Sequence, residues 1–100
     1  MELEHKEVEI DGQNYLIKLM PTMDGLDFIS RMQKEGMSSR VVFDAINHCV
    51  LQGSTSFTEK KFNSHFKGRY GHLMRVVEAV IEFNFPDLNE GNGESDTDDQ

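Results

Sequence analysis

Apolar and polar residues alternate in the first part of the chain, over residues 5–20. A period of two is typical of strands with one buried face. Asp11-Gly12 divides this stretch, and both residue types accept the positive φ that a tight hairpin turn requires. A two-residue loop would pair Val8 with Tyr15, and a four-residue loop would pair it with Ile17, so either register sets apolar against apolar. The pattern predicts an N-terminal β-hairpin.

Apolar residues then recur at helical spacing, which predicts helices over about residues 22–35, 39–52, 57–66 and 70–84. In the first helix the recurring apolar residues are Met23, Leu26, Ile29 and Met32, with Phe28 beside them. In the second they are Val42, Ala45, Ile46, Cys49 and Val50, and in the last they are Leu73, Val76, Val77, Val80 and Ile81. Each set is expected to form a buried face.

Capping residues mark where the helices begin. Thr22 is expected to cap the first helix and Ser38 or Ser39 the second, because their hydroxyls can accept from unpaired amides. Ser56 and Glu59 have the spacing of a capping box ahead of the short third helix.

Aromatic residues stand where the last helix must stop. Pro86 cannot continue a helix, and it pushes Phe85 toward an extended conformation. Phe83 and Phe85 are therefore expected to fold back over the end of the core. Phe62 and Phe66, four residues apart, are expected to pack in the same core.

These elements predict the α+β class, with an N-terminal β-hairpin packed on a small bundle of about four helices. Residues 1–87 form one domain in this interpretation. Residues 88–100 are poor in apolar side chains and rich in acids, Gly, Ser and Asn, so they are expected to form a disordered acidic tail.

Charge narrows the choice of partners. The chain of 100 residues carries a net charge of −8, and residues 87–100 hold six acids and no base. This balance argues against general binding to nucleic-acid backbones, which requires a sustained positive surface. Residues 59–75 are locally basic and contain aromatic side chains, so they are the candidate partner-binding stretch. The candidate residues are Lys60, Lys61, Lys67, Arg69, Tyr70 and Arg75.

Catalytic and metal-binding patterns are not apparent in the sequence. Cys49 is the single cysteine, and its neighbour His48 would point about 100° away from it on a helix. We therefore expect no enzyme activity, no metal and no cofactor. Since no apolar run reaches the roughly 20 residues that span a bilayer, and no signal peptide is evident, we expect a cytoplasmic protein.

Two stretches resemble the phage tail assembly chaperone family: VEIDGQNYLIKLMPTMDGL, residues 8–26, and FTEKKFNSHFKGRYGHLMRVVEAVIEFNFPD, residues 57–87. The resemblance covers about residues 6–87. It implies a protein of long-tailed phages or prophages that binds and solubilises the helical tape-measure protein before the tail tube forms. It also implies a possible longer form, made by ribosomal frameshifting, that recruits tail tube protein, and no catalytic residues. Self-association remains open.

Two other functions remain open on the sequence alone. The acidic tail is compatible with a phage-encoded regulator or inhibitor that mimics DNA and occupies a host protein. A transcription factor that uses residues 59–75 as a helix-turn-helix is less well supported, because the helix from His72 onward is apolar and offers only Arg75 to DNA.

Overall fold

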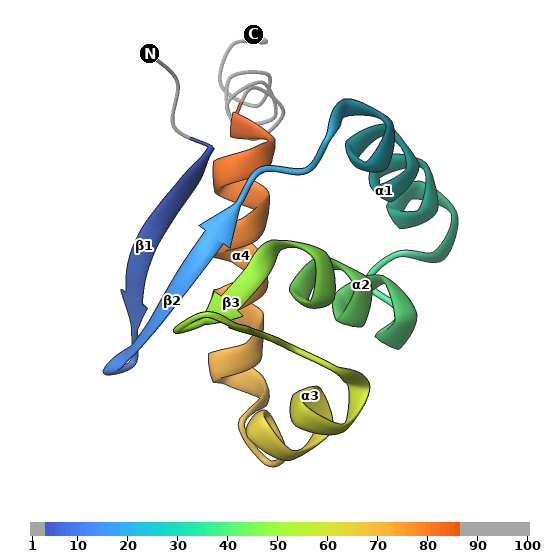
Figure 1. Ribbon diagram of the computed structural model, residues 1–100. Coiled ribbons are helices and arrows are strands. Elements are labelled where there is room, and N and C mark those ends of the chain that lie inside the picture. Colours follow the sequence, from blue (N-terminus) through green and yellow to red (C-terminus); the bar gives the residue numbers. More distant parts are fainter. Residues whose placement is uncertain (1–3, 87–100) are drawn as a thin grey trace, which may run out of the picture.

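The computed structural model describes residues 4–86, which form a small sheet covered on one face by helices (Figure 1). The elements in chain order are β1 (His5–Ile10), β2 (Gln13–Lys18), α1 (Thr22–Glu35), α2 (Ser39–Cys49), β3 (Val50–Gln52), β4 (Thr55–Ser56), α3 (Glu59–His65) and α4 (Tyr70–Asn84). The predicted α+β class with an N-terminal hairpin and four helices is confirmed. The prediction of a disordered tail concerns residues that lie outside the described part of the chain.

The hairpin closes through a two-residue turn. Asp11 and Gly12 have φ values of 54° and 83°, and Val8 lies opposite Tyr15. This register is the first of the two predicted alternatives. It places Tyr15 and Ile17 on the face that the helices cover, where both side chains are buried.

A four-stranded antiparallel sheet with the order β1-β2-β3-β4 replaces the isolated hairpin of the prediction. The predicted helix over residues 39–52 ends at Cys49, and Val50 begins a strand with φ −120° and ψ 130°. Val50 pairs with Ile17 and is fully buried. Burial at this position fits either a helix or a strand, so the apolar pattern alone placed the boundary wrongly.

The third helix begins later than predicted. Thr58 is its N-cap, accepting from the backbone N–H of Lys61 at 3.2 Å, whereas the predicted cap Ser56 belongs to β4. Phe57 lies between these elements and is fully buried. In the second helix the N-cap is Ser38, whose hydroxyl accepts from Val41 N–H. Ser38 is one of the two residues predicted for this cap.

Helix α1 turns a different side toward the core than the spacing predicted. Gly25 and Phe28 are its buried residues, while Met23 and Leu26 are 78% and 59% exposed. Gly25 allows the Phe85 ring to approach, since a Cβ at this position would lie 3.6 Å from Phe85 Cε1. Thr22 also differs from prediction, because α1 starts after Pro21 and its first turn has no side-chain cap.

The aromatic end of α4 packs as predicted. Phe83 and Phe85 are partly buried against the core, and Phe85 stacks on Phe28 with 5.9 Å between ring centroids and 2° between planes. Asn84 fixes the same end to the sheet, because its Oδ1 accepts from Met20 N–H at 2.7 Å and its Nδ2 donates to the Lys18 carbonyl at 3.1 Å. The end of α4 is thus bound to the connection between β2 and α1.

Candidate partner-binding surfaces

The six candidate residues lie around the junction of α3 and α4, which we call the basic corner (Figure 1). Lys60, Lys67 and Tyr70 are exposed there, and Tyr70 is 71% exposed. These three side chains are available to a partner. Lys60 and Lys67 supply positive charge, and Tyr70 supplies an aromatic surface.

The other three candidates make contacts within the protein. Lys61 Nζ lies 4.8 Å above the ring of Phe57, and Arg69 donates to the His65 carbonyl at 3.2 Å. Arg75 donates through Nε to Asp11 at 2.9 Å. The structure therefore brings the predicted residues into one region, where Asp11 offsets the charge of Arg75 while Lys61 and Arg69 keep their charges.

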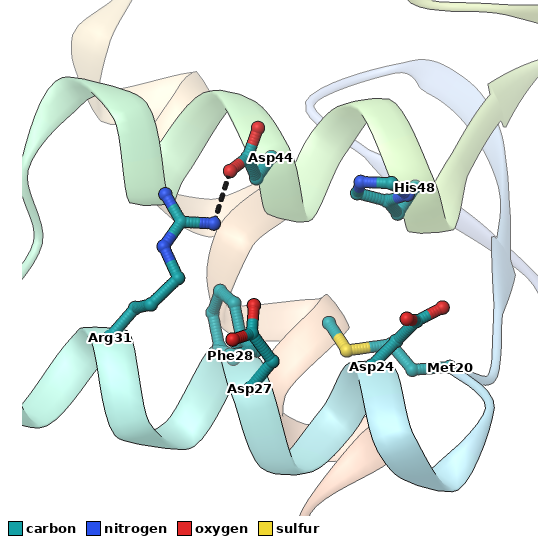
Figure 2. Close-up of a pocket in the computed structure, with 7 residues that line it drawn as sticks. All are labelled: Met20, Asp24, Asp27, Phe28, Arg31, Asp44 and His48. Carbon is teal, nitrogen blue, oxygen red and sulfur yellow. Dashed lines mark hydrogen bonds and ion pairs between the residues drawn. The ribbon is translucent and has the colours of Figure 1, made fainter.

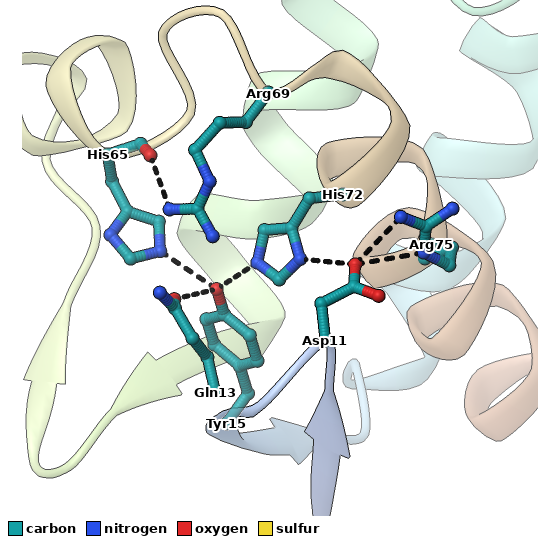
Figure 3. Close-up of polar contacts among 7 residues, drawn as sticks. All are labelled: Asp11, Gln13, Tyr15, His65, Arg69, His72 and Arg75. Atoms are coloured by element: carbon teal, nitrogen blue, oxygen red, sulfur yellow. Dashed lines mark hydrogen bonds and ion pairs between the residues drawn. The ribbon is translucent and has the colours of Figure 1, made fainter.

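A polar network lies behind the basic corner and centres on the hydroxyl of Tyr15 (Figure 3). This oxygen is 2.6 Å from His72 Nε2, 2.8 Å from His65 Nε2 and 3.0 Å from Gln13 Oε1. His72 Nδ1 lies 2.8 Å from Asp11 Oδ2, which also contacts Arg75. The network joins the hairpin to α3 and α4.

The proton arrangement in the network follows from the number of hydrogens available. Asp11 is an acceptor, so His72 donates to it from Nδ1. The single hydroxyl hydrogen of Tyr15 goes to Gln13 Oε1, which can only accept. The directions of the contacts between the tyrosine oxygen and the Nε2 atoms of His65 and His72 are set by the tautomer of each ring.

The pKa shifts agree with these surroundings. Hydrogen bonds from His72 and then Arg75 lower the pKa of Asp11, and burial raises the pKa of Tyr15. Burial, followed by the charge of Arg69, lowers the pKa of His65.

The order Asp11, His72, Tyr15 resembles a relay that activates a nucleophile. Nucleophilic attack requires that the oxygen meet a substrate, but Tyr15 is 2% exposed and His72 is 5% exposed. The hydroxyl is also surrounded by its three polar neighbours. The arrangement is therefore suited to holding the hairpin on α4, and we assign it a structural role.

A small pocket separates α1 from α2 (Figure 2). Its volume is about 50 Å³, and Arg31 pairs with Asp44 across one end of it. Ligand sites usually measure about 300–1,000 Å³, so this space suits water rather than a substrate. Asp24, Asp27 and His48 complete its polar wall.

A larger groove of about 290 Å³ runs between α1 and the end of α4, and we call it the α1 groove. Its apolar lining comes from Leu19, Met20, Leu26, Ile29 and Phe85. The exposed side chain of Met23 lies one helical turn before Leu26 on the same helix.

The interpretation of the sequence missed the α1 groove, because it placed Met23 and Leu26 on the buried face. A signal was present: α1 carries two apolar lines, Gly25–Phe28–Met32 and Met23–Leu26–Ile29. One narrow helix face cannot bury both.

His48 and Cys49 do not form a common site. His48 is exposed, whereas Cys49 is fully buried and burial raises the pKa of its thiol to about 11. Within residues 4–86, no group of three or more His, Cys, Asp or Glu side chains is arranged to hold a metal ion. In the same described part of the chain, no helix combines the length and the apolar character needed to cross a membrane.

Comparisons of the chain with protein-family models, with curated proteins and with solved structures found no match. The basic corner and the α1 groove are therefore the features on which an assignment of function depends.

Proposed function

We propose that this protein is a non-enzymatic tail assembly chaperone of a phage or prophage. It binds the tape-measure protein in the cytoplasm of the bacterial host and keeps it soluble until the tail tube forms around it. The protein is not retained in the mature virion. A longer frameshifted form, where one is made, would add contacts to the tail tube protein.

The exposed apolar surface along α1 is the observation that carries this proposal. A tape-measure protein is a long helical chain with exposed apolar faces, and a binding protein for it needs an apolar surface of its own. Met23 and Leu26 provide such a surface on a regular helix, next to the α1 groove. Methionine suits a client with many similar but unequal segments, because its side chain adapts to varied shapes.

The charge of the chain supports the same function. A chaperone that coats an apolar client must not aggregate with its own copies, and a net charge of −8 opposes self-association. The six acids among residues 87–100 would add to this effect by keeping the complex in solution.

A neighbouring gene that encodes a very long helical protein would supply the client, and co-expression with that protein tests the proposal. The tape-measure protein should be insoluble alone and soluble when the chaperone is present, and the two should co-purify in pull-down. A neighbour that stays insoluble, or that is soluble and does not co-purify, would contradict the chaperone function.

A DNA-binding function is tested separately at the basic corner. Replacing Lys60 and Lys67 with Glu reverses two exposed charges and spares Lys61, whose ammonium lies over Phe57. The double variant should slow association with the client and leave folding unchanged, because exposed charges contribute little to stability. Binding of wild type to duplex DNA in the micromolar range, abolished in this variant, would favour a DNA-binding transcription factor that uses residues 59–75 instead.

A further inference from the structure

Strand β1 stands at one end of the sheet order β1-β2-β3-β4 and runs along the outside of the sheet (Figure 1). Within residues 4–86 it pairs with β2 alone, over His5–Ile10. We propose that the free edge of β1 binds an extended segment of a partner protein, as an added strand in which basic and apolar side chains alternate. The chaperone function depends instead on the apolar surface of α1, so the two surfaces are separate.

The backbone of β1 offers hydrogen-bonding groups to a strand on its outer side. In an antiparallel pair, residues that bond to the neighbouring strand alternate with residues whose amide and carbonyl point away from it. Leu19 N–H donates to the Glu4 carbonyl at 3.0 Å, so the even-numbered residues of β1 bond to β2. The odd-numbered residues therefore turn their amides and carbonyls to the outer edge, where an extended segment can pair with them. These residues are His5, Glu7 and Glu9.

The register of the hairpin places the side chains of the same three residues on the open face of the sheet. Val8 lies opposite Tyr15, whose buried side chain faces the helices. Successive side chains of a strand point to opposite faces, so the odd-numbered residues of β1 face away from the helices. All three are exposed.

Glu7 and Glu9 make this face of β1 acidic. The β2 residues opposite them are uncharged, and the base on that face of β2, Lys18, lies opposite His5. The ion pairs of residues 4–86 involve neither glutamate. A hollow of about 410 Å³ beside both glutamates leaves room for long side chains. Lysine or arginine on an added strand would therefore meet an opposite charge that has no partner within the described residues.

The other face of β1 favours apolar side chains. Val8 and Ile10 are partly buried and pack against the core. Because β1 is the last strand of the sheet, apolar side chains on an added strand would cover the outer side of both residues. Lys6 is exposed on this face, so the apolar match applies to the half of β1 nearest the turn. The fitting partner therefore alternates basic with apolar residues.

A second copy of the chain fits this edge less well. Two β1 strands related by a two-fold axis pair antiparallel, and side chains on the same face lie opposite each other. A centre at Glu7 or Glu9 sets that glutamate against its own copy. A centre at Val8 sets Glu7 against Glu9, and a centre at Lys6 sets two lysines together. Like charges directly opposite are destabilising. The chain's own residues 87–100, with six acids and no base, also have the wrong sign for this edge.

Short synthetic peptides test the inference, one with lysine and one with glutamate at every second position, and with valine and threonine between. Fluorescence anisotropy would measure the binding of each to the full-length protein. The lysine peptide should bind at least about tenfold more tightly than the glutamate peptide, and the difference should shrink as salt rises toward about 0.5 M. A scrambled lysine peptide, with the same composition but no alternation, should bind more weakly than the alternating one.

Amide hydrogen exchange followed by NMR tests the strand pairing itself. In the free protein the amides of Glu7 and Glu9 should exchange quickly, because they point outward, and those of Lys6 and Val8 should exchange slowly, because they bond to β2. A saturating amount of the lysine peptide should slow exchange at Glu7 and Glu9 by at least about tenfold.

The double variant Glu7→Gln with Glu9→Gln tests the charge match with little risk to the fold, because both side chains are exposed. It should weaken binding of the lysine peptide by roughly tenfold, within the range that two cross-strand pairs of opposite charge contribute. Asp27→Asn with Glu59→Gln is the matched control. It removes two exposed acids from α1 and α3, away from β1 (Figure 1), and should change affinity by less than about twofold.

Several results would overturn the inference. They are no binding of the lysine peptide, equal binding of the alternating lysine peptide and either other peptide at low salt, and equal effects of the two double variants. Binding that leaves the amides of Glu7 and Glu9 unprotected would also overturn it, because the contact would then be one of charge alone. Sedimentation velocity tests the second-copy occupant, and a dimer that protects these amides without any peptide would contradict the proposed partner.

Discussion

Replacing Tyr15 with Phe removes one oxygen and leaves the ring, so it isolates what the hydroxyl contributes. Without this oxygen, His72 Nε2 loses its partner at 2.6 Å while its ring stays buried. His65 and Gln13 are only partly buried, so water can replace the lost contact for them. A buried polar atom left without a partner costs about 1–3 kcal/mol. We therefore expect the free energy of unfolding to fall by about 2 kcal/mol.

Urea denaturation and thermal melting of the full-length protein measure the effect. A loss of 2 kcal/mol corresponds to a melting temperature lower by roughly 8–16 °C in a domain of this size. Tyr70→Phe is the control, because that hydroxyl is on an exposed side chain and its loss should change stability by less than about 0.5 kcal/mol. A Tyr15→Phe protein as stable as the Tyr70→Phe protein would show that the network contributes nothing to stability.

Three further predictions concern single residues. Because burial lowers the pKa of His65 below 6.5, the unfolded chain takes up the proton first as pH falls. The stability that depends on neutral His65 is complete above about pH 6.5 and is lost as pH falls through the lowered pKa. His65→Gln should therefore lose less unfolding free energy than wild type between about pH 7.5 and 5.5 in urea titrations. Cys49 should resist iodoacetamide at about pH 8 in the folded protein and react in concentrated guanidinium chloride, as mass spectrometry would show, since its thiol is buried with a pKa of about 11. Gly12→Ala should lower the free energy of unfolding by about 1 kcal/mol, because Gly12 has φ +83°. Gly71→Ala, on an exposed face of α4, should raise it by about 0.5–1 kcal/mol. Equal effects of the two substitutions in urea denaturation would contradict the requirement for glycine in the hairpin turn.

The parts of the fold that followed from the sequence are those that local periodicity specifies. The register of Val8 with Tyr15 follows from an Asp-Gly turn between two alternating strands. The buried faces of α2 and α4 follow from apolar residues at helical spacing, of which Ile81 alone is only partly buried.

The parts of the fold that the sequence did not predict depend on contacts between residues that are distant in the chain. Val50 becomes a strand residue because Ile17 is there to pair with it. Gly25 and Phe28 face the core because the Phe85 ring lies against them, and this arrangement is what leaves Met23 exposed. Local spacing contains no information on which of two apolar lines the rest of the protein will cover.

The same limit applies to the candidate surfaces. The basic character of residues 59–75 was visible in the sequence, but Arg75 pairs with Asp11, 64 residues away. The network around Tyr15 likewise joins residues 50 and 57 positions apart. Such pairings remove charge and polarity from a surface that composition alone would make more positive.

The attachment of the hairpin to α4 determines when the core can close as the chain is synthesised. β1 and β2 are synthesised before the rest of this fold, and the residues that hold Asp11 and Tyr15 in place, His65, His72 and Arg75, follow 50–64 positions later. Until α4 emerges, Tyr15 and Ile17 lack much of the cover that buries them in the finished fold. The nascent chain therefore exposes an apolar strand until α4 has been synthesised, and the closing of its core is a nonlocal event.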